Sequence, residues 1–124
     1  METNGRINKN NISFFSMDKR RNIRVEYKTS VEVQQLGIHE KPMFTATTKS
    51  LSIGGILLES PDPVDIGAKI QINMALDSTS PLLIIGTVGR SEKMESGNYE
   101  ISVAFLDSDK VFKNEISSYL IKHL

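Results

Sequence analysis

The sequence predicts an all-β domain, a barrel of six short antiparallel strands followed by an α-helix. Between residues 25 and 105, apolar or β-branched residues alternate with polar ones in six segments, and turn-forming residues recur about every eight to twelve residues. After residue 107 the apolar spacing changes from two to about four, which is typical of an amphipathic helix. A chain of 124 residues is long enough for one hydrophobic core and too short for two.

The first strand is expected from Val25 to Val33, where every second residue is apolar or β-branched. Turns of glycine, proline, serine, asparagine and aspartate separate it from the strands that follow. The helix is expected at about 108–124, because Phe112, Ile116 and Leu120 recur every four residues. The other five strands are expected at about 43–49, 56–59, 69–76, 82–90 and 99–105.

Residues 1–17 are expected to form a flexible N-terminal arm, and residues 18–124 to form the folded domain. The arm is polar and rich in asparagine, with few residues to bury. Its two adjacent aromatic residues, Phe14 and Phe15, could contact another surface.

The composition argues against several classes of protein. Fifteen basic and fifteen acidic residues cancel, so a general DNA- or RNA-binding protein is not expected. The chain has no cysteine, which excludes disulfides and thiolate chemistry. No apolar run approaches the roughly 20 residues that cross a bilayer, and no hydrophobic signal core is present at the N-terminus. We therefore expect a cytoplasmic protein without membrane insertion.

A basic cluster precedes the first strand. Lys19, Arg20, Arg21 and Arg24 fall within six residues, with no carboxylate among them. A guanidinium can hold a phosphate through two parallel hydrogen bonds or stack on a base. The cluster therefore predicts an anion clamp at one end of the barrel, although a solvated lead-in to the first strand explains the same run of charge.

A second motif joins the expected second and third strands. Ser50, Ser52, Gly54 and Gly55 form an S-x-S-x-G-G corner, in which hydroxyls and exposed amides could bind a polar ligand. Adjacent glycines allow a positive φ or a close approach of the backbone to another segment. Taken alone, the string is typical of a β-turn. The string indicates a ligand site only because it lies one hairpin after the R-x-x-x-R pattern of Arg20 and Arg24.

The two motifs, in this order and at this distance, resemble those of the PilZ domain family. The resemblance covers roughly residues 18–124. Its segments are 19–25, 51–58, 66–70, 86–90 and 101–107. It implies a six-stranded antiparallel split β-barrel with a C-terminal helix, and a bacterial receptor domain that binds the second messenger cyclic di-GMP.

By position, Arg20 and Arg24 resemble the two clamp arginines of this family, with Arg21 beside them. Ser52 and Gly55 match the serine and the closing glycine of the family motif [D/N]-x-S-x-x-G, and Gly54 precedes that glycine. Ser50 departs from the motif, since the family has Asp or Asn there. A neutral hydrogen bond contributes less than a charged one, and the difference corresponds to roughly tenfold weaker binding.

Three functions remain open from the sequence. The first is a cyclic di-GMP receptor that signals through an unidentified downstream protein. The second is a degenerate PilZ-type adaptor that binds no nucleotide and acts through protein contacts, with Phe14, Phe15, Ile84 and Ile85 as candidate contact residues. The third, a barrel for single-stranded nucleic acid, lacks the aromatic platforms such surfaces need.

No enzyme, catalytic residue, metal site or cofactor is expected. A catalytic Ser-His-acid relay needs a histidine positioned by an acid, but His39 lies in an expected turn and His123 near the end of the chain, so both are expected at the surface. No His/Asp/Glu cluster has the spacing of metal ligands.

Overall fold

The computed structural model describes residues 23–37, 42–76, 81–106 and 110–124, with side chains in the last segment described from residue 113. The strands are β1 (Val25–Glu26), β2 (Ser30–Leu36), β3 (Phe44–Leu51), β4 (Gly55–Ser60), β5 (Lys69–Met74), β6 (Leu82–Lys93) and β7 (Tyr99–Phe105). Helix α3 spans Lys110–Lys122. The predicted arm, including Phe14 and Phe15, and the start of the predicted helix, residues 108–109, lie outside the described residues.

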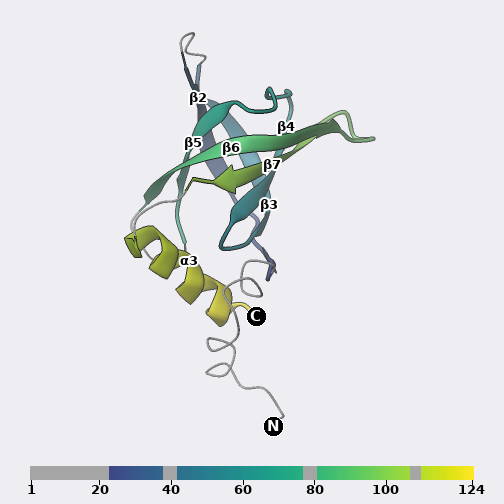
Figure 1. Cartoon of the computed structure of the whole chain (residues 1–124). Coiled ribbons are helices and arrows are strands. Elements are labelled where there is room, and N and C mark those ends of the chain that lie inside the picture. Colours follow the sequence, from purple (N-terminus) through teal and green to yellow (C-terminus); the bar gives the residue numbers. More distant parts are fainter. Residues whose placement is uncertain (1–22, 38–41, 77–80, 107–109) are drawn as a thin grey trace.

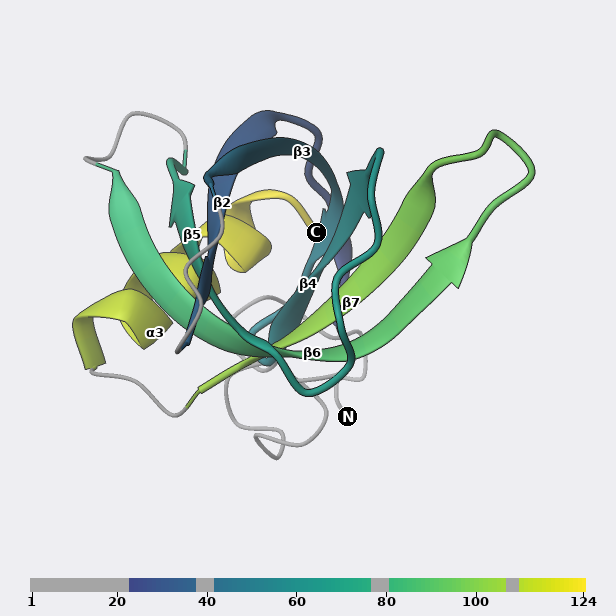
Figure 2. The same ribbon diagram turned by 90° about the horizontal axis from the view of Figure 1, so that it is seen from above.

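Six of these strands close into an antiparallel barrel, as the sequence predicts. The order β3-β2-β5-β6-β7-β4 is completed by a pairing of β4 with β3. Figure 2 looks along the barrel and shows the strands curving around a common interior. The two-residue strand β1 pairs with the end of β3, where Val25 lies opposite Leu51 and Glu26 opposite Ser50.

Helix α3 lies across one open end of the barrel (Figure 1). Its buried face consists of Ile116, Tyr119 and Leu120, which recur with the three- and four-residue spacing of one helical stripe. The Tyr119 ring packs edge-on against Tyr27 from the segment after β1, with centroids 5.4 Å apart. The helix therefore closes the end of the barrel from which β1 enters.

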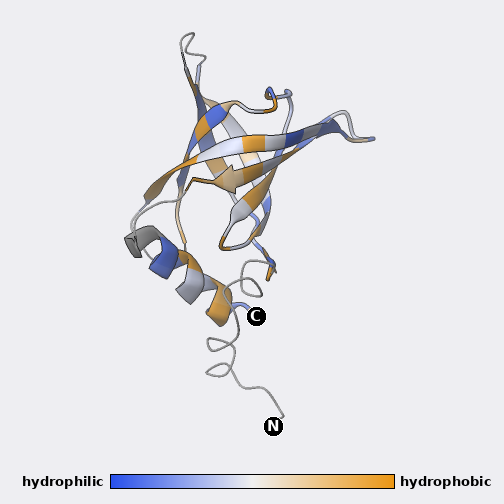
Figure 3. Cartoon of the chain, viewed as in Figure 1, coloured by the Kyte–Doolittle hydropathy of each residue, from blue (hydrophilic) through white to orange (hydrophobic). Residues whose placement is uncertain are grey.

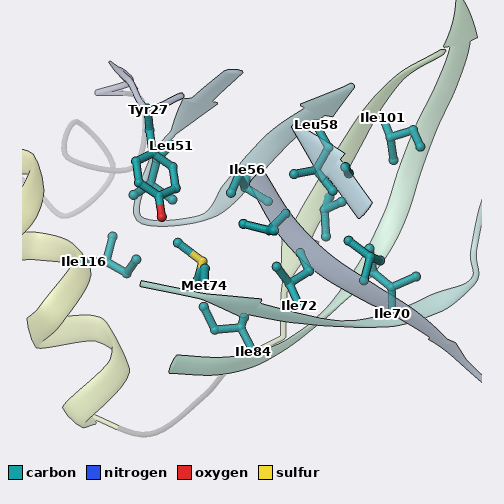
Figure 4. Close-up of a cluster of buried hydrophobic side chains, with 14 of the residues drawn as sticks. Tyr27, Leu51, Ile56, Leu58, Ile70, Ile72, Met74, Ile84, Ile101 and Ile116 are labelled. Carbon is teal, nitrogen blue, oxygen red and sulfur yellow. The ribbon is translucent and has the colours of Figure 1, made fainter. Parts of the chain in front are cut away.

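The core fills the interior of the barrel, and Figure 4 shows side chains from several strands converging there with Ile116 of α3. Alternate residues of each strand point inward, so apolar and polar residues alternate along the ribbons in Figure 3. The largest fully buried side chains include Leu51, Ile56, Leu58, Ile70, Ile72, Met74, Leu76 and Ile101.

Two details of the sequence prediction are wrong. The expected strand 25–33 is interrupted at residues 27–29, where the ladder leaves β3 and resumes as β2. The adjacent pair Ile84 and Ile85 is not exposed as a unit. Successive strand residues face opposite sides of a sheet, so Ile84 is buried and Ile85 is 39% exposed.

Helices in the described part of the chain are too short and too polar to span a bilayer.

Candidate functional site

The corner between β3 and β4 is held by the Ser52-x-x-Gly55 segment. The Ser52 backbone N–H donates to the Gly55 carbonyl at 2.9 Å. The Ser52 hydroxyl accepts from the Gly55 N–H at 3.2 Å and donates to the Gly55 carbonyl, whose O lies 3.3 Å away. Ser52 is only 2% exposed. Its hydroxyl is therefore occupied within the turn, and it shapes the surface of the corner from beneath.

The two adjacent glycines of the corner serve different purposes. A Cβ on Gly55 would lie 2.3 Å from the Val103 carbonyl oxygen of β7, whereas a Cβ on Gly54 would meet nothing within 4 Å. Neither glycine has a positive φ; the described glycines that do are Gly37, Gly67 and Gly97. Of the two expected reasons for a glycine pair, close backbone approach applies, and it applies to Gly55.

Arg24 lies beside this corner. Its guanidinium Nη1 donates to the Ser50 hydroxyl at 3.1 Å, and Arg24 itself is exposed. The contact is possible because β1 pairs with the last two residues of β3, which places residue 24 at the start of the corner. Two motifs that are 26 residues apart in the sequence thus meet at one place.

Thr48 fixes the course of the chain between Arg24 and β2. Its side chain is wholly buried, and its hydroxyl accepts from the Thr29 N–H at 2.8 Å while donating to the Tyr27 carbonyl. The Tyr27 N–H in turn donates to the Lys49 carbonyl at 3.1 Å. One inward-pointing hydroxyl therefore satisfies the backbone groups freed where the predicted first strand is interrupted.

The outer surface beside Ser50 is a row of residues in register across four strands. Ser50 of β3 lies opposite Leu57 of β4, Leu57 opposite Ser102 of β7, and Ser102 opposite Arg90 of β6. Bulges shift the register at Lys49 in β3 and at Gly89 in β6. Because of the first bulge, Lys49 and Ser50 are both half-buried instead of alternating between core and solvent.

Glu100 of β7 joins the cations around this row. Its Oε2 lies 2.8 Å from Lys49 Nζ, and its Oε1 lies 3.1 Å from Arg90 Nη2. The hydrogen bond from Lys49 lowers the pKa of the Glu100 carboxyl below its ordinary value of 4.5 and raises the pKa of Lys49 above 10.5. Glu92 also contacts Arg90, at 3.1 Å. Ion pairing therefore neutralises the two cations that accompany Arg24 on this surface.

The site is an open surface at the α3 end of β3. A pocket of about 310 Å³ lies at the opposite end of the same strand, lined by Gln35, Phe44, Val64 and their neighbours. It shares no residue with either motif. Arg20 and Arg21 lie outside the described residues, so their place at the site stays a prediction.

The comparisons with known proteins agree with this geometry. The family model described as the PilZ domain matches residues 18–122, which is most of the chain. The chain belongs to the PilZ domain family. A search of curated protein sequences found no match.

Several solved structures, two of them PilZ domains, share this fold at low sequence identity. The PilZ domain of YcgR from Escherichia coli, solved with c-di-GMP, is 14% identical with a TM-score of 0.59, over 85% of this chain and 91% of that one. The PilZ domain of CeSA from a cellulose-synthesizing bacterium is 17% identical with a TM-score of 0.58, over 80% and 95%. K. pneumonia MrkH is 16% identical with a TM-score of 0.62 over 83% of this chain, which spans only 48% of MrkH.

Three charged residues at the site were missed from the sequence: Lys49, Arg90 and Glu100. Arg90 and Glu100 are ten residues apart on the consecutive strands β6 and β7, but Lys49 lies on β3, 51 residues before Glu100, and no spacing rule links it to them. Two signals were available: Lys49 directly precedes Ser50, and Arg90 ends the family-like segment 86–90.

Proposed function

We propose that this PilZ domain is a receptor for cyclic di-GMP that signals through a protein partner. Arg20, Arg21 and Arg24 would bind the phosphates and stack on guanine, and Ser50 would accept a hydrogen bond from the ligand. Ser52, Gly54 and Gly55 would present the corner on which the ligand lies.

The contact between Arg24 and Ser50 carries the proposal. An exposed guanidinium and a hydroxyl, 3.1 Å apart, combine the donor fork that phosphate requires with a neighbouring acceptor. Arg24 also directly precedes the short strand β1, which pairs with β3, so its backbone is positioned before any ligand arrives. The c-di-GMP-bound structures among the PilZ neighbours, those of YcgR and of Borreliella burgdorferi PlzA, support the same ligand class.

Calorimetric titration with cyclic di-GMP tests the proposal, with Arg24→Ala and Arg20→Ala beside the wild type. Removal of one charged hydrogen-bond donor costs about 1.5–3 kcal/mol, so affinity should fall roughly 10- to 150-fold. Lys28→Ala is the matched control, because Lys28 is an exposed cation nearby whose Nζ faces Glu26 at 3.5 Å. The proposal fails if the wild type releases no heat at roughly millimolar ligand, or if both arginine variants bind as the wild type does.

A nucleotide-free adaptor is the second candidate, and Ser50 favours it. The hydroxyl is shorter and weaker as an acceptor than the family's carboxylate, and the buried Ser52 hydroxyl is already used within its turn. Ser50→Asp distinguishes the two functions. A wild type that does not bind cyclic di-GMP, together with a Ser50→Asp variant that does, would establish the adaptor.

A further inference from the structure

The surface that extends from Ser50 to Arg90 is large enough for a dinucleotide. Strands β3, β4, β7 and β6 form one continuous wall of the barrel (Figure 2). The row crosses three interstrand spacings, so its ends are about 14 Å apart. Its middle residues, Leu57 and Ser102, are partly exposed and have short or apolar side chains. A ligand placed against Arg24 and Ser50 would therefore have room to extend toward Arg90.

Glu100 places a fixed negative charge beside this row. It lies two residues from Ser102 on β7, on the same face of the strand. Each of its oxygens is held by a cation from a different strand, Lys49 on β3 and Arg90 on β6. The Glu100 side chain is 21% exposed and the Lys49 side chain 34% exposed, so solvent still reaches the pair. The cations are held in place, but an incoming anion can contact them.

We propose that Glu100 is an internal competitor for the ligand, holding Lys49 and Arg90 until a phosphate of the cyclic dinucleotide takes them over. This inference rests on the proposed function. Glu100 would position both cations beside the row and, through its own charge, set an upper limit on affinity. It is thus a positioning residue that tunes the concentration at which the receptor responds.

Glu92 does not have this role, although it contacts the same arginine. Its side chain is 65% exposed against 21% for Glu100, and among the described residues it contacts one cation, Arg90, whereas Glu100 contacts two. An ion pair so exposed contributes little. Glu92 is therefore a matched control for Glu100, because the two residues carry the same formal charge but, within the part of the chain described, Glu100 contacts two cations and Glu92 only Arg90.

The test measures cyclic di-GMP affinity for Glu100→Gln, Glu92→Gln, Lys49→Gln and the double variant Lys49→Gln/Glu100→Gln. Glu100→Gln should bind about three- to sevenfold more tightly than the wild type, the factor for removing one repulsive charge roughly 7 Å away at a solvated surface. Glu92→Gln should change affinity less than about twofold. Lys49→Gln should weaken binding, and the double variant should return close to the wild type.

Salt dependence adds a readout that a purely structural role would not change. The affinity of Glu100→Gln should fall more steeply with ionic strength than that of the wild type, because the site carries one more net positive charge. Circular dichroism and thermal melts establish that each variant folds. If Glu100→Gln does not fold, the affinity of Lys49→Gln for cyclic di-GMP tests the inference by itself. Unchanged affinity in that variant overturns the inference.

The remaining outcomes separate this inference from the proposed function. Wild-type binding that Glu100→Gln leaves unchanged or weakens overturns the competitor role and leaves the receptor function standing. Binding by Glu100→Gln where the wild type shows none supports both. If neither protein binds, the receptor function is wrong and the competitor role is wrong with it.

Discussion

Replacing Gly55 with alanine tests whether the closing glycine of the corner is structural. The added Cβ would lie 2.3 Å from the Val103 carbonyl oxygen, so β4 and β7 must separate by roughly 1 Å. Overpacking against a backbone atom costs about 1–3 kcal/mol, and we expect the upper end because no flexible side chain can move aside. With an unfolding entropy of about 2.1 cal/mol/K per residue, a loss of about 3 kcal/mol lowers Tm by about 12 °C.

Gly54→Ala is the control for this experiment, since it adds the same methyl group one residue away. It meets no atom within 4 Å and has no positive φ, so it should leave stability unchanged or raise it by about 0.4–1 kcal/mol. Urea denaturation followed by circular dichroism measures both variants. Equal stability of Gly55→Ala and Gly54→Ala would refute the reasoning, because the contact between β4 and β7 would then not constrain residue 55.

Three further predictions concern the frame of the site. Thr48→Val should lower the free energy of unfolding in urea by about 1–3 kcal/mol, because the Thr29 N–H loses its acceptor, and Thr48→Ser should recover most of the loss. The ionised Glu100 carboxylate should stabilise the folded state near neutral pH, because the pKa of Glu100 is lower in the folded state than in the unfolded chain. This stabilisation should disappear as the pH falls below 4.5, so the thermal melting temperatures of the wild type and Glu100→Gln should converge in acid. Ile116→Ala should cost about 2–5 kcal/mol in denaturant, whereas the exposed substitution Asn114→Ala should cost much less.

The architecture was predictable because the spacing of apolar residues is regular within most elements, two residues in the strands and about four in the helix. Alternation along β5 and β7 and the four-residue spacing in α3 indicate which side of each element is buried. The interruption after Glu26 was not predictable. It depends on the Thr48 hydroxyl reaching backbone groups nineteen to twenty-one residues away, and a buried threonine looks in sequence like any other strand residue.

The site was predictable in part, for a related reason. Arg24 and Ser50 lie in motifs that can be read along the chain, and their contact follows from the pairing of β1 with β3. The ion pair between Lys49 and Glu100 crosses β4 and requires knowledge that β4 lies between β3 and β7. The sequence does not reveal that arrangement, because β3 and β7 are separated along the chain by β5 and β6 as well as β4.

The circular strand order also determines how another protein can attach. Each of the strands β2–β7 has a neighbour on both sides, but β5 pairs with β6 only as far as Thr87, so among the described residues 90–93 of β6 pair with β7 alone. Within the described part of the chain, the two-residue strand β1 also keeps one flank unpaired. The closed part of the wall offers almost no free N–H and C=O groups to a foreign strand, and the longest open flank of the described strands is the charged end of β6, where Arg90, Glu92 and Lys93 disfavour sheet-to-sheet aggregation. A partner that binds the closed part of the barrel must therefore recognise side chains on its surface, whereas strand addition is open to it only along the end of β6.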